Sequence, residues 1–221
     1  EKEFIDSIDE VIYTIESYDT TTIRASVGNW LIAKYIKNTN DSIKVIFNGD
    51  GSDELTGGYM YFHNAPDILE CDKECKRLLN HIHYFDVLRS DRSISSHGLE
   101  ARTPFLDREF VQTYLSIPVS FRHANLHRKD MMEKQLLRHA FWNQDKSKQI
   151  LPDSILWRPK EAFSDGVSSL KKSWFQIIQN HIKKYFKTMG VEGTEKEIIT
   201  NLSKNNWNNP PETLEQLYYR M

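Results

Sequence analysis

The residues best suited to chemistry follow a short apolar run. Segment 45–47 is β-branched and apolar, and it stops at a glycine-spaced turn, 48–54, which reads NGDGSDE. In open α/β sheets, ligands bind just past the carboxyl ends of buried parallel strands. Glycines there let backbone N–H groups approach an oxyanion. The carboxylates of Asp50, Asp53 and Glu54 suit a magnesium ion on the phosphates of a nucleotide. The turn therefore predicts phosphate chemistry at the end of a buried strand.

This spacing excludes several familiar motifs. A dinucleotide fingerprint needs glycine where Glu54 stands, and no Walker loop occurs in the chain. A calcium loop beginning at Asn48 needs glycine where Asp53 stands. The alternative interpretation is a tight turn whose acids favour the N-terminus of a following helix.

A second segment with chemical potential is 157–166, which reads WRPKEAFSDG. Lys160 stands there on a loop whose backbone Pro159 restricts. A lysine on such a loop can lie over a phosphate or a developing oxyanion. The alternative is a solvated basic loop that Trp157 anchors, because charged surface loops are common.

Hydrophobic periodicity predicts the elements that position these segments. Isoleucine and valine recur at helical spacing over 8–15, and a longer stripe runs from Ile23 to Tyr35 after a cluster of N-cap residues at 18–22. We expect a turn at 37–41, a strand at 44–47 and a long helix over 68–89. Pro104 predicts a loop over 100–107, with Phe105 and Leu106 in the core. Further helices are expected at 136–141, 153–157 and 170–185. The predicted fold is a mostly helical α/β layer with one secure parallel strand.

Composition describes an ordinary water-soluble protein and excludes several classes of function. The 221 residues are 39% hydrophobic and 27% charged, with a formal net charge of −2. This balance provides no basic surface for nucleic acid. No apolar run reaches the roughly 18 residues that span a bilayer. No secretory signal stands at the first residues. We expect a reducing, cytoplasmic setting, and the first residue, Glu1, suggests a piece of a longer protein.

The chain has two cysteines, Cys71 and Cys75, which are four residues apart in a predicted helix. The spacing places both thiols on one helical face, but no second pair or His cluster completes a tetrahedral metal site. We expect two half-buried thiols without a metal.

Taken together, these segments closely resemble the synthetase domain of glutamine-dependent asparagine synthetases. The similarity lies in several separate motifs, which occur in the order and spacing of that family and cover nearly the whole chain. They are NGDGSDELTGGYMY at 48–61, FDVLR at 85–89, HGLEARTPFLD at 97–107, WRPKEAFSDG at 157–166, DEVI at 9–12 and RASVG at 24–28.

The resemblance implies a fold, a reaction and a set of roles. The fold is an adenine-nucleotide α-hydrolase-like parallel sheet layer. ATP activates the side chain of aspartate as an aspartyl adenylate, and ammonia from glutamine then displaces AMP. By resemblance, Asp50 and Lys160 are catalytic, Asp53 holds Mg²⁺, and other residues contact ATP or shape the substrate pocket. The ATP contacts are Asn48, Gly49, Gly51, Ser52 and Asp53, and the pocket candidates are Tyr59, Asp86, Arg89, Glu100 and Arg102.

The chain also departs from the family pattern. Asp50 stands where the family has glutamate, and Asn48 stands where it has serine. The pyrophosphate loop S-G-G-x-D-S and the amidase domain with its N-terminal cysteine do not occur in residues 1–221. We therefore interpret 1–221 as part of an ATP-pyrophosphatase-type synthetase domain that is inactive alone, with a homodimer open as its assembly. Two other interpretations stay open, namely a β-lactam-synthetase-like adenylating enzyme and a non-catalytic remnant that serves as a binding module.

Overall fold

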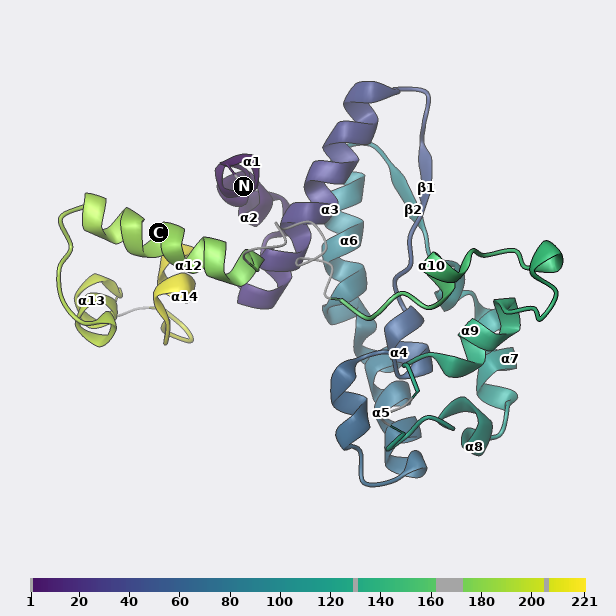
Figure 1. Cartoon of the computed structure of the whole chain (residues 1–221). Coiled ribbons are helices and arrows are strands. Elements are labelled where there is room, and N and C mark those ends of the chain that lie inside the picture. Colours follow the sequence, from purple (N-terminus) through teal and green to yellow (C-terminus); the bar gives the residue numbers. More distant parts are fainter. Residues whose placement is uncertain (1, 129–130, 162–172, 205–206) are drawn as a thin grey trace. The chain divides into compact units, whose positions relative to one another are not determined.

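The computed structural model describes residues 2–128, 131–161, 173–204 and 207–221, and the chain forms two compact units (Figure 1). Unit 1 consists of Glu1–Val45, Leu88–Glu100 and Ala162–Met221. Unit 2 consists of Ile46–Val87 and Ala101–Glu161. The chain therefore passes from one unit to the other four times.

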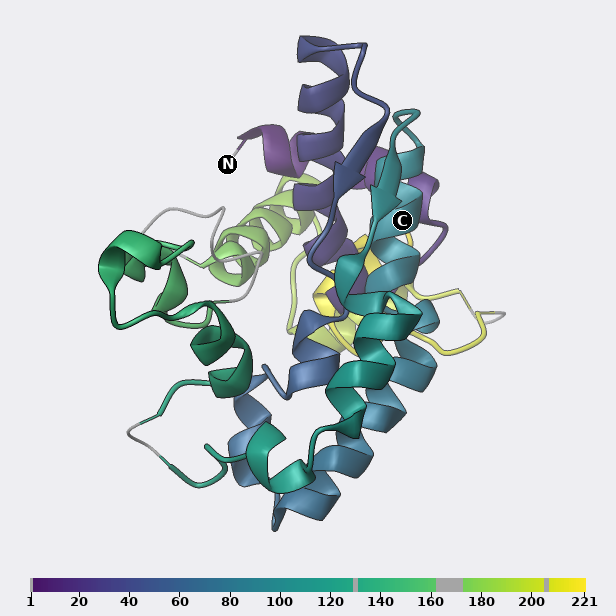
Figure 2. The same cartoon turned by 90° about the vertical axis from the view of Figure 1, so that its right-hand side faces the viewer.

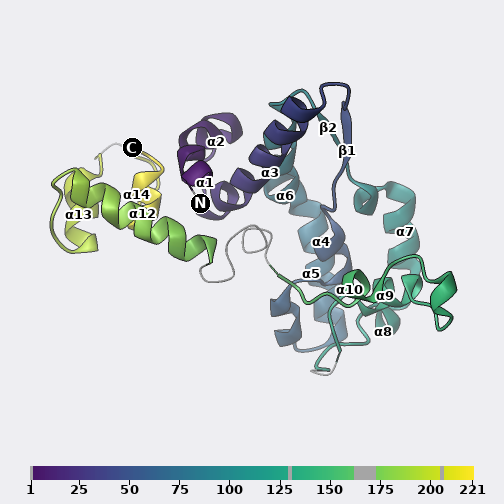
Figure 3. The same ribbon diagram turned by 45° about the horizontal axis from the view of Figure 1, so that its top comes forward.

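Unit 1 is helical, and its core joins the two ends of the described sequence. Apolar side chains from α2, α3, α12 and α14 form one buried cluster that includes Ile8, Val27, Ile178 and Leu217. Figure 3 shows α12, α13 and α14 gathered together. The helices of this unit are α1 (Lys2–Asp6), α2 (Ile8–Ile15), α3 (Thr20–Thr39), most of α6 (Asp86–Ser95), α12 (Trp174–Thr188), α13 (Glu195–Leu202) and α14 (Leu214–Tyr218).

Unit 2 is built from short helices and turns around the longer helix α5. A small buried cluster of Phe62, Cys71 and Cys75 lies between α5 and the preceding 3-10 turn. The helices are α4 (Ser52–Thr56), α5 (Ile68–His81), α7 (Arg108–Ser116), α8 (Val119–Arg122), α9 (Gln135–Phe141) and α10 (Asp153–Leu156). The 3-10 turns are η1 (Met60–Asn64), η2 (Ile82–Tyr84), η3 (Pro104–Leu106) and η4 (Lys146–Lys148).

Two strands, β1 (Val45–Phe47) and β2 (Glu100–Arg102), form a small sheet (Figure 2). The N–H of Glu100 donates to the carbonyl of Lys44 at 2.7 Å, and the N–H of Asn48 donates to the carbonyl of Arg102 at 2.8 Å. Residue numbers rise together along both strands, so the pair is parallel. The prediction of a mostly helical chain with a parallel sheet layer is confirmed.

Most predicted helices form where the periodicity placed them. Asp19 caps α3 by accepting from the N–H of Thr22 at 2.7 Å, and α2, α9 and α10 occupy their predicted segments. Helix α12 begins at Trp174 after a capping box at Ser173, whereas residues 170–172 of that prediction lie outside the described residues. The segments with caps or a clear apolar stripe are the ones that the sequence locates well.

Two predicted boundaries are wrong. Helix α3 continues to Thr39, so the turn starts at Asn40, whose side chain accepts from the N–H of Ser42. The long helix predicted over 68–89 ends at His81, and α6 starts at Asp86 after the η2 turn. The periodicity missed this break because Ile82, in the turn, is buried like the apolar residues of a helix stripe.

The predicted loop over 100–107 contains the strand β2 and the turn η3, in which Phe105 and Leu106 are half-buried rather than core residues. The strand carries no β-branched residue, so pairing with β1, not local preference, makes it a strand. The expectation that β1 is buried is also wrong, since 83% of Phe47 is exposed. Within the described residues, β1 pairs with β2 alone, so its other edge has no strand partner.

The two thiols are buried more deeply than expected, with 2% of Cys71 and none of Cys75 exposed. Both are free, and the Sγ of Cys71 lies 3.3 Å from Nδ1 of His123. In the part of the chain that the structure describes, no three His, Cys, Asp or Glu residues are placed to hold a metal ion. None of its helices is both long and apolar enough to cross a membrane.

Candidate functional site

The turn after β1 is held by its own side chains. The amide of Asn48 donates to Oδ2 of Asp50 at 2.9 Å, and the N–H of Asp50 donates back to Oδ1 of Asn48 at 3.1 Å. Such Asx contacts compete with regular secondary structure and fix a tight turn. Asn48 and Asp50 thus form a small reciprocal pair at the end of the strand.

Gly51 ends this turn and begins the short helix α4. Its φ of +87° lies in the left-handed region, which favours glycine. A Cβ at this position would overlap the side chain of Leu106, so the close packing also requires glycine. The turn therefore delivers Ser52 and Asp53 to one place at the start of α4.

Asp53 lies between two ammonium groups that come from distant parts of unit 2. Its Oδ1 is 2.8 Å from Nζ of Lys134, and its Oδ2 is 2.7 Å from Nζ of Lys160. Lys134 also donates to the hydroxyl of Ser52 at 3.0 Å. Burial acts to raise the pKa of Asp53, but the two lysines outweigh it, and the pKa lies below its usual range. Asp53 is therefore a carboxylate shared by two cations.

Two backbone features make this close approach feasible. A Cβ on Gly58 would overlap both the carboxylate of Asp53 and the side chain of Lys134, so no larger residue fits there. Lys134 itself has a φ of +59°, which is uncommon for a residue with a side chain. Backbone of this kind persists only where surrounding contacts enforce it, and it is concentrated at functional sites.

The neighbouring acid, Glu54, faces the opposite electrostatic environment. It is only 3% exposed, and its Oε1 accepts the hydroxyl of Tyr59 at 2.5 Å. Burial first, and then the nearby carboxyl of Asp86, raise the pKa of Glu54 to about 7. The same burial and acids raise the pKa of Tyr59 as well. Buried Glu54 and the half-buried Tyr59 and Asp86 thus form an acidic group beside the charged cluster of Asp53 and its two lysines.

The remaining predicted residues are distributed between the units. Arg102 ends β2, and its carbonyl accepts from the N–H of Asn48, so it lies beside the start of the turn. Gly49 is exposed within the turn. Arg89 and Glu100 belong to unit 1, and the structure does not assign them to the cluster around Asp53. Residues 162–166 of the second motif lie outside the described residues.

Sequence reasoning missed one residue of this site, Lys134, and did not foresee the burial of another, Glu54. Lys134 precedes α9 in an ordinary polar stretch, and its role follows from a contact with Ser52 that spans 82 residues. Glu54 was visible as one of the three acids of the turn. Its burial against Tyr59, however, depends on how the chain folds back after α4. The GSDE run was the signal for Glu54, and nothing in the sequence singled out Lys134.

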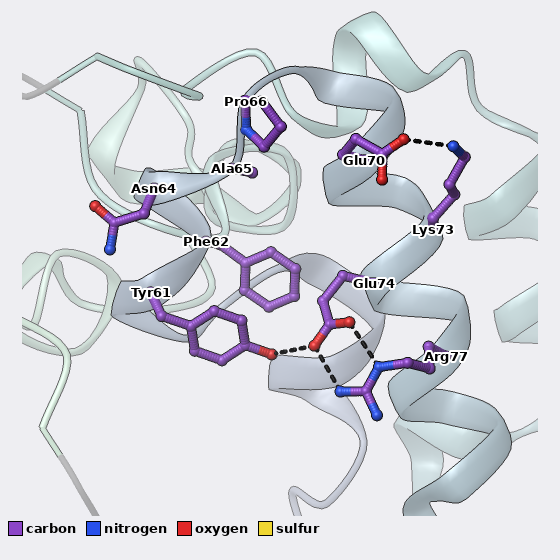
Figure 4. A pocket seen from close by; sticks show the side chains of 9 residues that line it. All are labelled: Tyr61, Phe62, Asn64, Ala65, Pro66, Glu70, Lys73, Glu74 and Arg77. Atoms are coloured by element: carbon purple, nitrogen blue, oxygen red, sulfur yellow. Dashed lines mark hydrogen bonds and ion pairs between the residues drawn. The ribbon is translucent and has the colours of Figure 1, made fainter.

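A surface pocket of about 590 Å³ lies between η1 and α5 (Figure 4). The rings of Tyr61 and Phe62 form one wall, and charged residues of α5 form the other. Those charges already pair with each other: Glu74 accepts from Arg77 and from the hydroxyl of Tyr61. None of the predicted site residues lines this pocket, so it is not the candidate site.

The groups around Asp53 match what a magnesium–polyphosphate needs. The carboxylates of Asp50 and Asp53 and the hydroxyl of Ser52 are hard oxygen donors of the kind that Mg²⁺ prefers. Lys134 and Lys160 supply positive charge for phosphate oxygens. These donors and cations are of the chemical kind that a magnesium–nucleotide ligand needs.

Comparisons with known proteins point to one family. The family model described as asparagine synthase matches residues 1–73 and 67–216. Over 219 residues the chain is 47% identical to the asparagine synthetase (glutamine-hydrolyzing) of Gallus gallus, 48% to that of Rattus norvegicus and 46% to that of Homo sapiens. Each match covers 99% of this chain and 36% of the relative. The chain thus spans about a third of the length of the curated relatives that it matches.

Proposed function

The chain belongs to the asparagine synthase family, and on that basis we propose that it is part of an enzyme that makes asparagine from aspartate and ATP. The side-chain carboxylate of aspartate attacks the α-phosphorus of ATP and releases pyrophosphate. Ammonia then attacks the acyl carbon of the aspartyl adenylate, and AMP leaves. The relatives are named as glutamine-hydrolyzing, and glutamine is the nitrogen source that we propose here.

The observation that carries this proposal is the position of Asp53 between Lys134 and Lys160. Adenylation and pyrophosphate release spread negative charge over phosphate oxygens, so the reaction needs positioned cations more than covalent help from the protein. Lys160 stabilises charge on the transferring phosphate, and Lys134 neutralises the pyrophosphate side. Asp53 holds both ammonium groups near the place where that charge develops.

The magnesium ion would bind Asp53, with Asp50 and Ser52 close by, and would supply charge neutralisation for the departing pyrophosphate. The turn residues Asn48, Gly49 and Gly51 contact the nucleotide from the end of β1. Within unit 2, the pocket for aspartate is proposed to draw on Tyr59, Asp86 and Arg102, whereas Arg89 and Glu100 of unit 1 stay predictions from the sequence. We also propose a cytoplasmic location, because both cysteines are free thiols and thiols stay reduced in the cytosol.

The test is aspartate-dependent release of pyrophosphate by the full-length protein that carries this chain. Replacing Lys160→Ala should lower kcat about 100-fold or more, because it removes a preorganised charge at the transferring group. Chelation of Mg²⁺ should abolish turnover. The matched control is Lys146→Ala, which removes an exposed lysine of the same unit that pairs with Asp153.

A comparison of aspartate with larger carboxylate substrates distinguishes asparagine synthesis from the two other interpretations. Turnover with aspartate but not with larger carboxylates supports asparagine synthesis over a β-lactam-synthetase-like reaction. ATP binding without pyrophosphate release, with or without the Lys160 change, would instead identify a non-catalytic binding module. Normal turnover in Lys160→Ala would refute the proposed role of that lysine.

A further inference from the structure

We propose that Tyr59, anchored by Glu54, is a positioning residue whose aromatic face holds the ammonium group of Lys160. This inference rests on the proposed function, in which Lys160 acts on the transferring phosphate. It adds a second support for Lys160, independent of the ion pair with Asp53. Its consequence is that Lys160 stays in place when Asp53 is engaged by another cation.

The geometry places Lys160 between two supports from the same part of unit 2. Its Nζ lies 2.7 Å from the carboxylate of Asp53 and 5.5 Å from the centroid of the Tyr59 ring. An ammonium group at that distance over an aromatic face is attracted by the ring quadrupole. Lys160 and Tyr59 are far apart in the sequence, so the fold and not local geometry creates this contact.

The ring of Tyr59 is itself fixed. Its hydroxyl donates to Oε1 of Glu54 at 2.5 Å, and Glu54 is buried in α4. Its ring stacks with Tyr61 at 5.9 Å and with Phe62 at 6.5 Å between centroids. The left-handed Gly57, which ends α4, turns the chain toward this position. The hydrogen bond of its hydroxyl and the stacking of its face fix the ring of Tyr59, so the ring can restrict the position of the flexible Lys160 side chain.

The ion pair alone is a poor way to hold Lys160 during the reaction. Asp53 is shared with Lys134, and in the proposed function it also binds the magnesium ion. A carboxylate that turns toward a metal weakens its contact with an ammonium group. A lysine side chain has four rotatable bonds, so an ammonium group that loses its partner regains conformational freedom and leaves its position. The neutral ring of Tyr59 does not compete for the metal and remains in contact.

The first experiment measures the reactivity of individual lysines in the full-length protein without substrates. Acetic anhydride acetylates exposed amines, and mass spectrometry gives the rate at Lys160, Lys134 and Lys146 in the same sample. In Tyr59→Leu we expect the rate at Lys160 to rise about threefold, the size of effect that one cation–ring contact provides. The rates at Lys134 and Lys146 should stay at the wild-type value, since Asp53 and Ser52 hold the first and Asp153 pairs with the second.

Matched variants separate the ring contact from general loosening. Trp142→Leu removes the ring that lies 5.9 Å from Nζ of Lys146, and it should change the rate at Lys146 but not at Lys160. Asp53→Asn should raise the rates at both Lys134 and Lys160. If Tyr59→Leu does not fold, Tyr59→Phe keeps the ring but loses the anchor on Glu54, and should give a smaller increase at Lys160.

The catalytic readout follows from the same contact. Tyr59→Leu should lower kcat about tenfold with little change in KM for ATP, because a displaced lysine affects the transition state more than binding. Tyr59→Trp, which retains an aromatic face, should restore much of that loss. The inference would be overturned if Lys160 were acetylated at the wild-type rate in both Tyr59→Leu and Tyr59→Phe. That result is distinguishable from a failure of the proposed function, because acetylation requires no turnover.

Discussion

Two adjacent acids of α4, Asp53 and Glu54, have opposite electrostatic surroundings. Asp53 faces the ammonium groups of Lys134 and Lys160, which keep its pKa below the usual range. Glu54 faces a phenol and a carboxyl in a buried environment, which raise its pKa to about 7. Near neutral pH the first acid is therefore charged, while the second is close to its midpoint. Two neighbouring carboxyl groups in this site therefore differ in their protonation because their surroundings differ.

The raised pKa of Glu54 predicts a pH dependence of stability. The folded protein binds this proton more tightly than the unfolded chain does. The stability it contributes is therefore complete below about pH 4.5 and is lost as the pH rises through about 7. The side chain of the Glu54→Gln variant cannot ionise. The free energy of unfolding of this variant minus that of the wild type should therefore be roughly 2 kcal/mol larger at pH 8 than at pH 5. Urea unfolding at the two pH values measures this difference.

The control for that measurement is Glu74→Gln. Arg77 keeps the pKa of Glu74 below its usual range, so its contribution does not change between pH 5 and pH 8. The difference between Glu74→Gln and wild type should therefore be the same at both pH values. A constant difference for Glu54→Gln as well would contradict the assigned titration.

At the scale of elements, caps and tertiary packing decide where helices begin. Helix α3 has 20 residues, and its first turn is closed by the side chain of Asp19. Its buried face, which includes Ile23 and Trp30, belongs to the core of unit 1. The cap and the core therefore act on the same helix, and each can be tested by itself.

Removing the cap should cost a predictable amount. Asp19→Ala leaves the N–H of Thr22 without its acceptor, and the free energy of unfolding should fall by about 1 kcal/mol. Asp19→Asn keeps an oxygen acceptor at the same place and should stay within a few tenths of a kcal/mol of wild type. Chemical denaturation of both variants measures the effect. Equal stability of the two variants would show that the cap does not matter here.

The elements also show what could be predicted from the sequence. Helices with a periodic apolar face and a cap, such as α3 and α12, were located because the signal is local. The strand β2 and the break between α5 and α6 were not, because pairing and packing with distant residues decide them. The same distinction holds in the site. Asp53 and Lys160 lie in recognisable motifs, whereas Lys134 is recruited only by the fold.

At the scale of the whole molecule, unit 1 is closed by contacts between the start and the end of the described sequence. The buried carboxylate of Glu215 in α14 accepts from Arg24 in α3, 191 residues away. It also accepts from Gln179 in α12 at 2.5 Å and from the hydroxyl of Tyr219 at 2.8 Å. One side chain therefore connects three helices.

Loss of this carboxylate should destabilise unit 1 strongly. Glu215→Ala leaves several donors without an acceptor, and the free energy of unfolding should fall by about 2–3 kcal/mol; partial exposure of Arg24 limits the loss. Glu212→Ala, an exposed neighbour just before α14, is the control and should have little effect. Thermal unfolding of the full-length protein measures both. A similar small change in the two variants would contradict this role for Glu215.

The four passages of the chain between the units have a consequence for its synthesis. Unit 2 is complete in sequence once Glu161 has left the ribosome, whereas unit 1 needs the residues up to Met221. At about 5–20 residues per second, the last segment takes several further seconds to emerge. During that time the apolar faces of α2 and α3 have no α12 or α14 to cover them. Helices α2 and α3 therefore stay without part of their core until the much later segment that forms α12 and α14 has been synthesised.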